Sequence, residues 1–226
     1  MKQKYWQVLP VGPTIFGDSP YQPSSGCAGN IYFIDLDKLV DEGLLEKEEI
    51  LGYNWGTDES EIDYAALHQN RCKILQKAFE RFDTNAQDFQ DFVKKQSEWL
   101  EQYALFMTLK TDNLYKNWSE WPSEYRNPQT VALEKYQKKN YNTIAFWKFC
   151  QYKFFEQWED LKNYANSKGV YIIGDISFYV GYDSVDVWAE RQLFMMSAND
   201  TPEYVAAAGP DKYSESGQVW GNPMYD

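Results

Sequence analysis

The sequence contains little histidine and little cysteine. His68 is the only histidine, and the three cysteines, Cys27, Cys72 and Cys150, lie far apart with no CxxC spacing. One histidine excludes a cluster of histidine ligands for a metal ion, and the cysteine spacing indicates neither a thiolate zinc site nor a disulfide framework. We therefore expect a protein without a metal ion or another cofactor, in which His68 lies or packs on a helix surface.

The sequence also has few basic residues relative to acidic ones. Lys and Arg number 22 against 34 Asp and Glu, which gives a net charge of −12 at pH 7. This charge would repel a phosphate backbone, so we expect no nucleic-acid partner. No run of about 18 apolar residues is present, which argues against a membrane span. The opening residues, Met1-Lys2-Gln3-Lys4, are not followed by the apolar region of a signal peptide, so we expect a cytoplasmic protein.

Aromatic residues, in contrast, are abundant. They form 18% of the sequence, with nine Trp and 18 Tyr, and hydrophobic residues together form 43%. This content supports a packed core and argues against wholesale disorder. The rings of Trp and Tyr are also natural stacking surfaces for sugars, because each combines an apolar face with a polar edge. Packing in a core is the commoner role for any one of them.

Two segments are predicted to be buried strands. Residues 5–9 are followed by the turn residues Pro10, Gly12 and Pro13, and residues 170–173 are followed by Gly174-Asp175. The loop at 10–30 is long for a connection, which is typical of functional or disordered loops. The chain after about residue 176 is predicted to be mostly loop, with a short helix at 184–190.

The middle of the chain is predicted to form three long helices, at residues 64–82, 86–110 and 130–168. Their apolar residues recur at steps of three and four, and the stripe of the second helix is interrupted at Gln96. Asp35 or Asp37 is a candidate cap for a short preceding helix that ends near Gly43, and Gly169 is placed to end the third long helix. Such stripes are typical of a helical core.

Four strings near the ends of the chain carry a further signal. Tyr5-Trp6-Gln7-Val8-Leu9-Pro10-Val11-Gly12-Pro13-Thr14 and Gly17-Asp18-Ser19-Pro20-Tyr21-Gln22 stand near the start, and Ile172-Ile173-Gly174-Asp175 and Trp220-Gly221-Asn222-Pro223 stand near the end. These strings resemble amylomaltase, the 4-alpha-glucanotransferase branch of the alpha-amylase superfamily. The resemblance extends over nearly the full chain.

The resemblance implies an α/β fold, a partial (β/α)8 TIM barrel with a large helical insertion after an early barrel strand. Residues 1–35 would hold a barrel strand and the substrate-side loop. Residues 36–169 would hold the helical insertion and a barrel helix, and residues 170–226 the next barrel strand and active-site loops. Because a barrel needs eight strands and only two are predicted here, we expect exposed barrel edges and a tendency to self-associate.

The resemblance also implies a reaction. Amylomaltases transfer alpha-1,4-glucan segments between maltooligosaccharides by a retaining double displacement, which needs a carboxylate nucleophile and a carboxyl acid/base. By the resemblance, both groups and a further transition-state-stabilising aspartate fall in a part of the family that this chain lacks. We therefore expect a fragment of an enzyme of starch, glycogen and maltose metabolism that has no transferase activity alone.

Seven residues are expected to contact a maltooligosaccharide or another alpha-glucan. The resemblance gives Asp175 a supporting role at the sugar, places Ser19 and Tyr21 on a glucan-binding edge, and assigns Trp220, Gly221, Asn222 and Pro223 to a mobile loop on the acceptor side. Because loops after parallel strands share one rim, the side chains of Tyr21 and Asp175 should lie within about 10 Å of each other. Ser177 stands where the family has proline, which we expect to loosen its loop.

Simpler interpretations of these residues stay open. Asp175 could bond only to its own loop or cap a helix, Pro20-Tyr21 could form a rigid turn, and Trp220 could anchor an ordinary turn. At the level of the whole chain, two alternatives to an enzyme fragment remain. One is a non-catalytic glucan-binding module, and the other is a helical interaction protein that has merely inherited the sugar motifs.

Overall fold

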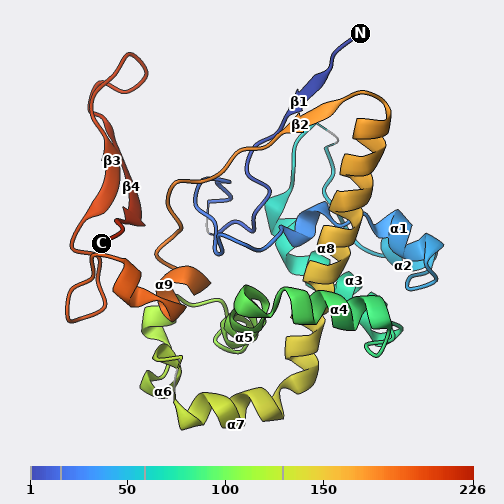
Figure 1. The fold of residues 1–226 in the computed structure, drawn as a ribbon, viewed down its shortest axis with the longest axis horizontal. Helices are drawn as coiled ribbons and strands as arrows, with labels where there is room; N and C mark the ends of the chain where they lie inside the picture. Colours follow the sequence, from blue (N-terminus) through green and yellow to red (C-terminus); the bar gives the residue numbers. More distant parts are fainter. Residues whose placement is uncertain (1, 16, 59, 129) are drawn as a thin grey trace.

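The computed structural model describes residues 2–15, 17–58, 60–128 and 130–226, and its elements mix helices with short strands (Figure 1). In chain order they are β1 (Tyr5–Gln7), the 3-10 turn η1 (Ile31–Phe33), α1 (Leu36–Asp41), α2 (Lys47–Leu51), α3 (Tyr64–Glu80), α4 (Gln87–Lys95), α5 (Ser97–Asp112), η2 (Trp118–Glu120), α6 (Ser123–Arg126), α7 (Val131–Lys139), α8 (Tyr141–Ser167), β2 (Tyr171–Ile173), α9 (Val185–Ala189), η3 (Arg191–Leu193), β3 (Val205–Ala208) and β4 (Gln218–Pro223). No described helix is long and apolar enough to cross a membrane.

The centre of the molecule is a helical core formed by α3, α4, α5 and α8. Helix α8 contacts each of the other three. Phe149 of α8, Phe106 of α5 and Ile74 of α3 are fully buried in one apolar cluster. Rings meet across the helices, as where Phe79 of α3 lies 5.5 Å from Phe149 of α8 between ring centroids. The predicted helix at 64–82 is confirmed by α3, and the aromatic stripes are core residues.

The other two predicted long helices are each divided in two. Gln96 separates α4 from α5, and its side-chain oxygen accepts a hydrogen bond from the Trp99 indole N–H at 2.9 Å. Asn140 separates α7 from α8, and its side-chain amide donates to the Tyr136 carbonyl at 3.1 Å. In both cases a polar side chain satisfies local groups at the helix ends, which allows the chain to change direction.

A segment before α1 is fastened along α8 by two glutamine side chains. Gln151 accepts from the Gly29 N–H at 2.7 Å and donates to the Gly29 carbonyl at 3.0 Å. Gln157 makes the same two bonds with Asp35, at 2.7 and 3.1 Å. Each side-chain amide thus accepts from the main-chain N–H and donates to the main-chain carbonyl of one residue, as the backbone of a neighbouring strand would. At Gly29 the packing is closed, because a Cβ there would lie 1.9 Å from the Phe154 ring.

Predicted helix ends are also confirmed. The Asp35 carboxylate accepts from the Asp37 N–H and caps the start of α1. Gly43 and Gly169 follow α1 and α8 with positive φ angles of 75° and 73°, a conformation that glycine adopts without the steric cost of a Cβ. The short helix predicted at 184–190 is α9, which begins after Ser184. The short helix α2 follows α1 and was not predicted.

The two predicted strands pair with each other in parallel, hereafter the strand pair. Tyr5 lies opposite Tyr171, and Gln7 lies opposite Ile173. Both strands were predicted to be buried, and this is wrong, because Tyr5 is 65% exposed and Tyr171 is 56% exposed. Strand β1 is also shorter than predicted. Among the described residues this sheet has two strands, so neither strand is covered by a neighbour on its outer edge.

The last part of the chain was predicted to be mostly loop, whereas it contains the antiparallel hairpin β3–β4. Val205 lies opposite Pro223 and Ala208 opposite Gln218, with an irregularity in register between them. The hairpin stands to one side of the helical core (Figure 1). Most of its side chains are exposed, so its strands show no apolar alternation that a sequence pattern could reveal.

Candidate functional site

The strand pair brings the two leading candidate residues into direct contact. Tyr21 lies in the loop after β1, and Asp175 comes two residues after β2. The Tyr21 hydroxyl donates a hydrogen bond to Asp175 Oδ2 at 2.7 Å. This confirms the expected proximity of the two side chains, and it follows from the parallel pairing, which directs both loops to the same edge of the sheet. Their contact with glucan stays a prediction.

The Asp175 carboxylate is held in a fixed orientation. Its Oδ1 accepts from the Ile176 backbone N–H at 2.8 Å, while Oδ2 accepts from Tyr21. A carboxylate has about four acceptor positions, so it can still accept bonds from a ligand's hydroxyl groups. The hydrogen bond to Asp175 raises the pKa of Tyr21, which keeps the phenol protonated as a donor. The pair therefore combines a charged acceptor with an exposed aromatic ring.

The loop after β1 is itself ordered by short polar contacts. The Ser19 hydroxyl accepts from the Tyr21 backbone N–H at 3.3 Å, which supports a turn around Pro20. The Ser177 hydroxyl lies 2.9 Å from the Tyr21 carbonyl oxygen and donates to it. This hydroxyl joins the loops that follow the two strands, and the loosening expected from serine at position 177 stays a prediction.

Residues 220–223 were predicted to be a mobile loop. The loop is wrong, because these residues form the end of strand β4, whereas their mobility stays a prediction. Trp220 is 43% exposed, and its indole N–H donates to the Gln218 side chain at 3.0 Å. Asn222 is buried and donates to the Val180 carbonyl at 3.0 Å. Gly221 has a positive φ of 78°, which places the bend of the strand next to Trp220.

Gln22 connects this hairpin to the first loop, and the sequence reasoning gave it no role. Its side-chain amide donates to the Trp220 carbonyl and lies 3.4 Å from Asn222 Oδ1. Its position directly after Tyr21 in the Ser-Pro-Tyr-Gln string was the available signal. Tyr21, Asp175 and the Trp220 segment thus form one connected group, hereafter the rim, although they come from three separate parts of the chain.

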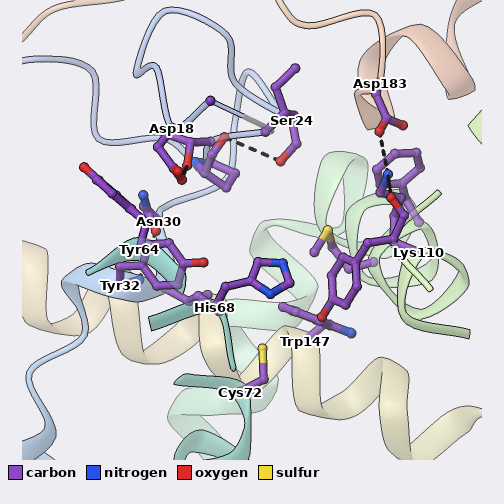
Figure 2. Close-up of a pocket in the computed structure, with 18 of the residues that line it drawn as sticks. Asp18, Ser24, Asn30, Tyr32, Tyr64, His68, Cys72, Lys110, Trp147 and Asp183 are labelled. Atoms are coloured by element: carbon purple, nitrogen blue, oxygen red, sulfur yellow. Dashed lines mark hydrogen bonds and ion pairs between the residues drawn. The ribbon is translucent and has the colours of Figure 1, made fainter. Parts of the chain in front are cut away.

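A separate cavity of about 570 Å³ lies behind the loop that carries Tyr21. Asp18 and Ser24 line one side of it, and His68, Cys72 and Trp147 line the other (Figure 2). The expected packing role of His68 is confirmed, because its ring lies 5.0 Å from the ring of Tyr115, between centroids. Rim residues Tyr21, Asp175 and Trp220 are not among the residues that line this cavity.

Burial governs the chemistry of this cavity. Desolvation raises the pKa of Tyr32 and of Tyr115 to about 12, so both phenols stay neutral hydrogen-bonding groups. The Trp147 indole N–H is buried and has no hydrogen-bond partner among the described residues. At one end Lys110 pairs with Asp183 at 2.5 Å, a contact that links α5 to the chain after β2 (Figure 2). Among the described residues, no group of three or more His, Cys, Asp and Glu is arranged to hold a metal ion.

A comparison with known protein families decides the family. The profile described as 4-alpha-glucanotransferase matches residues 1–226. The chain belongs to this family. Two 4-alpha-glucanotransferases are similar to it. That of Streptococcus pneumoniae strain TIGR4 is 44% identical over 230 residues, which cover 100% of this chain and 45% of the relative. That of Clostridium butyricum is 42% identical over 226 residues, which cover 99% of this chain and 46% of the relative.

A solved structure agrees with this assignment to the 4-alpha-glucanotransferase family. Amylomaltase from Streptococcus agalactiae, solved in complex with acarbose, matches 99% of this chain with a TM-score of 0.92 and 38% sequence identity. The matched part is 46% of that amylomaltase. The resemblance of the four sequence strings to amylomaltase is thereby confirmed. The chain spans about half the length of the relatives it matches.

Proposed function

We propose that the rim is one wall of an alpha-glucan site in a 4-alpha-glucanotransferase, an enzyme that transfers alpha-1,4-glucan segments between maltooligosaccharides. The observation that carries this proposal is the hydrogen bond between Tyr21 and Asp175 at the carboxyl edge of a parallel strand pair. Enzymes built on parallel β/α units place their site residues at this edge. Family membership supplies the substrate class.

In the proposed site, the side chains of the rim bind and orient sugar rather than break its bonds. The oriented Asp175 carboxylate accepts hydrogen bonds from sugar hydroxyl groups, and the exposed rings of Tyr21 and Trp220 stack against sugar faces. Ser19 orders the turn that presents Tyr21. Gly221, Asn222 and Pro223 fix the direction in which Trp220 faces on the acceptor side. Transfer to a sugar hydroxyl in place of water needs an acceptor side of this kind, which limits access of water.

The proposed chemistry is a retaining double displacement. It needs two carboxyl groups about 5–5.5 Å apart. One attacks the sugar, and the other first donates a proton to the bridging oxygen of the leaving segment and then removes the proton of the acceptor hydroxyl that displaces the enzyme. No residue of this chain matches either group of the family. We assign Asp175 to sugar binding, because hydrogen bonds from Tyr21 and from the Ile176 N–H orient its two oxygens. We propose that the chain supplies the binding wall and no part of bond breaking.

The proposed architecture is a partial (β/α)8 barrel that carries a helical insertion. The strand pair would supply two of the barrel strands, one within residues 1–35 and the other within residues 170–226. Residues 36–169 would hold the insertion and the barrel helix. The parallel register of β1 with β2 supports this arrangement, as does the entry of α8 into β2 through Gly169. A non-catalytic glucan-binding module is the second candidate, because the chain holds a binding wall without matched nucleophile or acid/base.

One experiment tests both the activity and the wall. The purified chain is incubated with maltotriose, and we expect no release of glucose and no longer oligosaccharides relative to a sample without protein. Binding of maltoheptaose is measured in parallel by calorimetry. Because a hydrogen bond to a charged group contributes about 1.5–3 kcal/mol, D175A should weaken binding roughly tenfold or more. Tyr21→Phe should weaken it less than Tyr21→Ala, since Phe keeps the ring.

Tyr141→Ala is the matched control for this experiment, because Tyr141 is also an exposed tyrosine and lies at the start of α8, outside the rim. Equal affinities for D175A and the Tyr141→Ala control would contradict the binding wall. Transfer of sugar by the chain alone would contradict the assignment of bond breaking to groups outside it, and would leave the binding wall in place.

A further inference from the structure

Ser177 connects the loop after β2 to the main chain of Tyr21. It follows Asp175 by two residues, and its hydroxyl lies 2.9 Å from the Tyr21 carbonyl oxygen. The Tyr21 hydroxyl in turn donates to Asp175 at 2.7 Å. Tyr21 is therefore joined to the loop after β2 at two points, through its main chain to Ser177 and through its side chain to Asp175.

The bond to Asp175 is too weak a contact to hold the Tyr21 phenol by itself. This bond is exposed, and single exposed hydrogen bonds contribute little net free energy. Tyr21 is 45% exposed, so packing fixes the direction of its ring only in part. Its main-chain N–H bonds to Ser19, within its own loop. The contact with Ser177 is what ties the main chain of Tyr21 to the loop that carries Asp175.

The segment that follows Ser177 is anchored to the core. The Tyr179 ring stacks on the Tyr225 ring with centroids 6.0 Å apart, and Tyr225 stacks on Phe194 at 5.1 Å. Phe194 belongs to the buried apolar cluster. The Ser177 hydroxyl also contacts the Tyr179 carbonyl oxygen, and because a hydroxyl has one proton, the Tyr21 and Tyr179 carbonyls are alternative or shared acceptors. Ser177 therefore lies between an anchored segment and the exposed loop of Tyr21.

We propose that Ser177 is a positioning residue of the rim, whose hydroxyl holds the main chain of Tyr21 so that the phenol meets Asp175. For sugar binding the inference rests on the proposed function, because the fixed pair then presents one ring and one carboxylate to a maltooligosaccharide. Where the family has proline, this chain restricts the loop through a hydrogen bond in place of a pyrrolidine ring. A loop loosened by serine and a loop held by serine make opposite predictions.

The alternative is a purely local role for Ser177. A hydroxyl that donated only to the Tyr179 carbonyl, two residues on, would shape its own loop and leave Tyr21 unaffected. Removal of the hydroxyl would then leave the bond between Tyr21 and Asp175 in place. The two roles differ in one measurable quantity, the pKa of the Tyr21 phenol, because the hydrogen bond to Asp175 raises it.

The test places a fluorinated tyrosine at position 21 of the purified chain. Fluorine lowers the pKa of a phenol, so fluorine NMR follows its titration at a lower pH than an ordinary tyrosine requires. Ser177→Ala should lower the phenol pKa in the same direction as Asp175→Asn, which removes the charge of the acceptor. Ser177→Thr keeps the hydroxyl and should keep the wild-type value. Ser167→Ala is the matched control, because the Ser167 hydroxyl also donates to a carbonyl, that of Tyr164 at 2.7 Å, at the end of α8.

Sugar binding is measured separately, by calorimetry with maltoheptaose and without the fluorine label. In a chain that binds maltoheptaose, Ser177→Ala should weaken binding about fivefold, as expected for the loss of one hydrogen bond that orders the site. Ser177→Thr and Ser167→Ala should bind as the wild-type chain does. Circular dichroism checks that all variants keep the helical core.

The outcomes separate the positioning role from the proposed function. An unchanged phenol pKa in Ser177→Ala would overturn the positioning role, and so would a lowered pKa that Ser177→Thr or Ser167→Ala also shows. A lowered pKa in Ser177→Ala with unchanged affinity for maltoheptaose would overturn the role of Ser177 in sugar binding. Absence of maltoheptaose binding by the wild-type chain would count against the proposed function alone, because the phenol titration needs no sugar.

Discussion

The helical core and the rim differ in how they are held together. In the core, side chains such as Phe106 and Phe149 are fully buried in one apolar cluster, and rings pack across helices, as between Phe79 of α3 and Phe149 of α8. At the rim, Tyr21, Asp175 and Trp220 are exposed and are joined mainly by individual hydrogen bonds. Apolar burial supplies most of the stability of a fold, whereas single exposed hydrogen bonds contribute little net free energy. Stability and binding chemistry are therefore located in different parts of this chain.

The largest effect on stability is expected for a substitution in the helical core, compared with a substitution in the strand pair. Phe149→Ala should lower the free energy of unfolding by about 3–5 kcal/mol, because it leaves a cavity among packed rings. Tyr171→Ala, on exposed β2, should change it by only about 0.5 kcal/mol. Urea unfolding followed by circular dichroism measures both. Equal losses would mean that the strand pair contributes to the same cooperative unit as the core.

A smaller effect is expected where the first loop meets the core. Gly29→Ala should destabilise the chain by about 1–3 kcal/mol, because the added methyl group would overlap the Phe154 ring and force it to move. Gly209→Ala is the control, since a Cβ there meets no atom within 4 Å. Thermal unfolding compares the two. A Gly29→Ala variant as stable as the control would show that the loop is not packed against α8 as described.

Hydrogen exchange tests the contrast within one sample. Amides of α3, α5 and α8 should be better protected than those of residues 5–9, because the core buries its helices and the strand pair has free edges.

Gln22→Ala should make residues 218–223 exchange roughly fivefold faster, as expected for the loss of about 1 kcal/mol. Gln87→Ala is the control, because the Gln87 side chain bonds to Asp91 on its own helix α4 and has no other side-chain bond among the described residues. Unchanged exchange in β4 would mean that Gln22 does not hold the hairpin.

The smallest effect is expected at the edge of the helical region. The hydrogen bond from Arg81 lowers the pKa of Glu49 from 4.5 to about 2. Because the folded-state pKa is depressed, this contribution to stability is present above about pH 4.5 and is lost as the pH falls towards 2. The Tm difference between the wild-type chain and Arg81→Met should therefore shrink over that range. Lys162→Met, which removes an exposed pair with Glu159, is the control. A constant difference would contradict the depressed pKa.

Local patterns predicted the elements that depend on local causes. The apolar repeat located α3, Asp35 located the start of α1, and Gly169 located the end of α8. The breaks at Gln96 and Asn140 were not predicted. The apolar stripe is interrupted at Gln96, but one polar residue in a stripe does not by itself end a helix, and the side-chain hydrogen bonds of Gln96 and Asn140 appear only in the structure. Exposed barrel edges were expected from the resemblance, but the strand sequences themselves predicted buried side chains. An apolar strand has the same sequence whether or not its neighbours are present.

The candidate site, too, could be predicted from the sequence only in part. The contact of Tyr21 with Asp175 was predictable, because parallel strands direct their following loops to one edge. The placement of Trp220 within a hairpin was not, since β3 and β4 are held by main-chain bonds and have little apolar alternation. The role of Gln22 depends on the position of that hairpin, so no pattern in the Ser-Pro-Tyr-Gln string could identify its partners.

The two glutamine pairs on α8 have a consequence for the length of the chain around them. Gly29 with Gln151 and Asp35 with Gln157 are each 122 positions apart. The exposed ion pair of Lys38 with Asp160 has the same separation. The segment 29–38 therefore advances residue for residue with a helix that rises about 1.5 Å per residue, although an extended chain would advance about 3.3 Å.

The turn η1 and the start of α1 shorten the segment to match that rise. An insertion or deletion anywhere between residues 29 and 38 would put every later pair out of step, unless α8 changed by the same number of residues. The hairpin loop at 209–217 is not paired position by position with a helix, so its length can vary without disturbing such pairs.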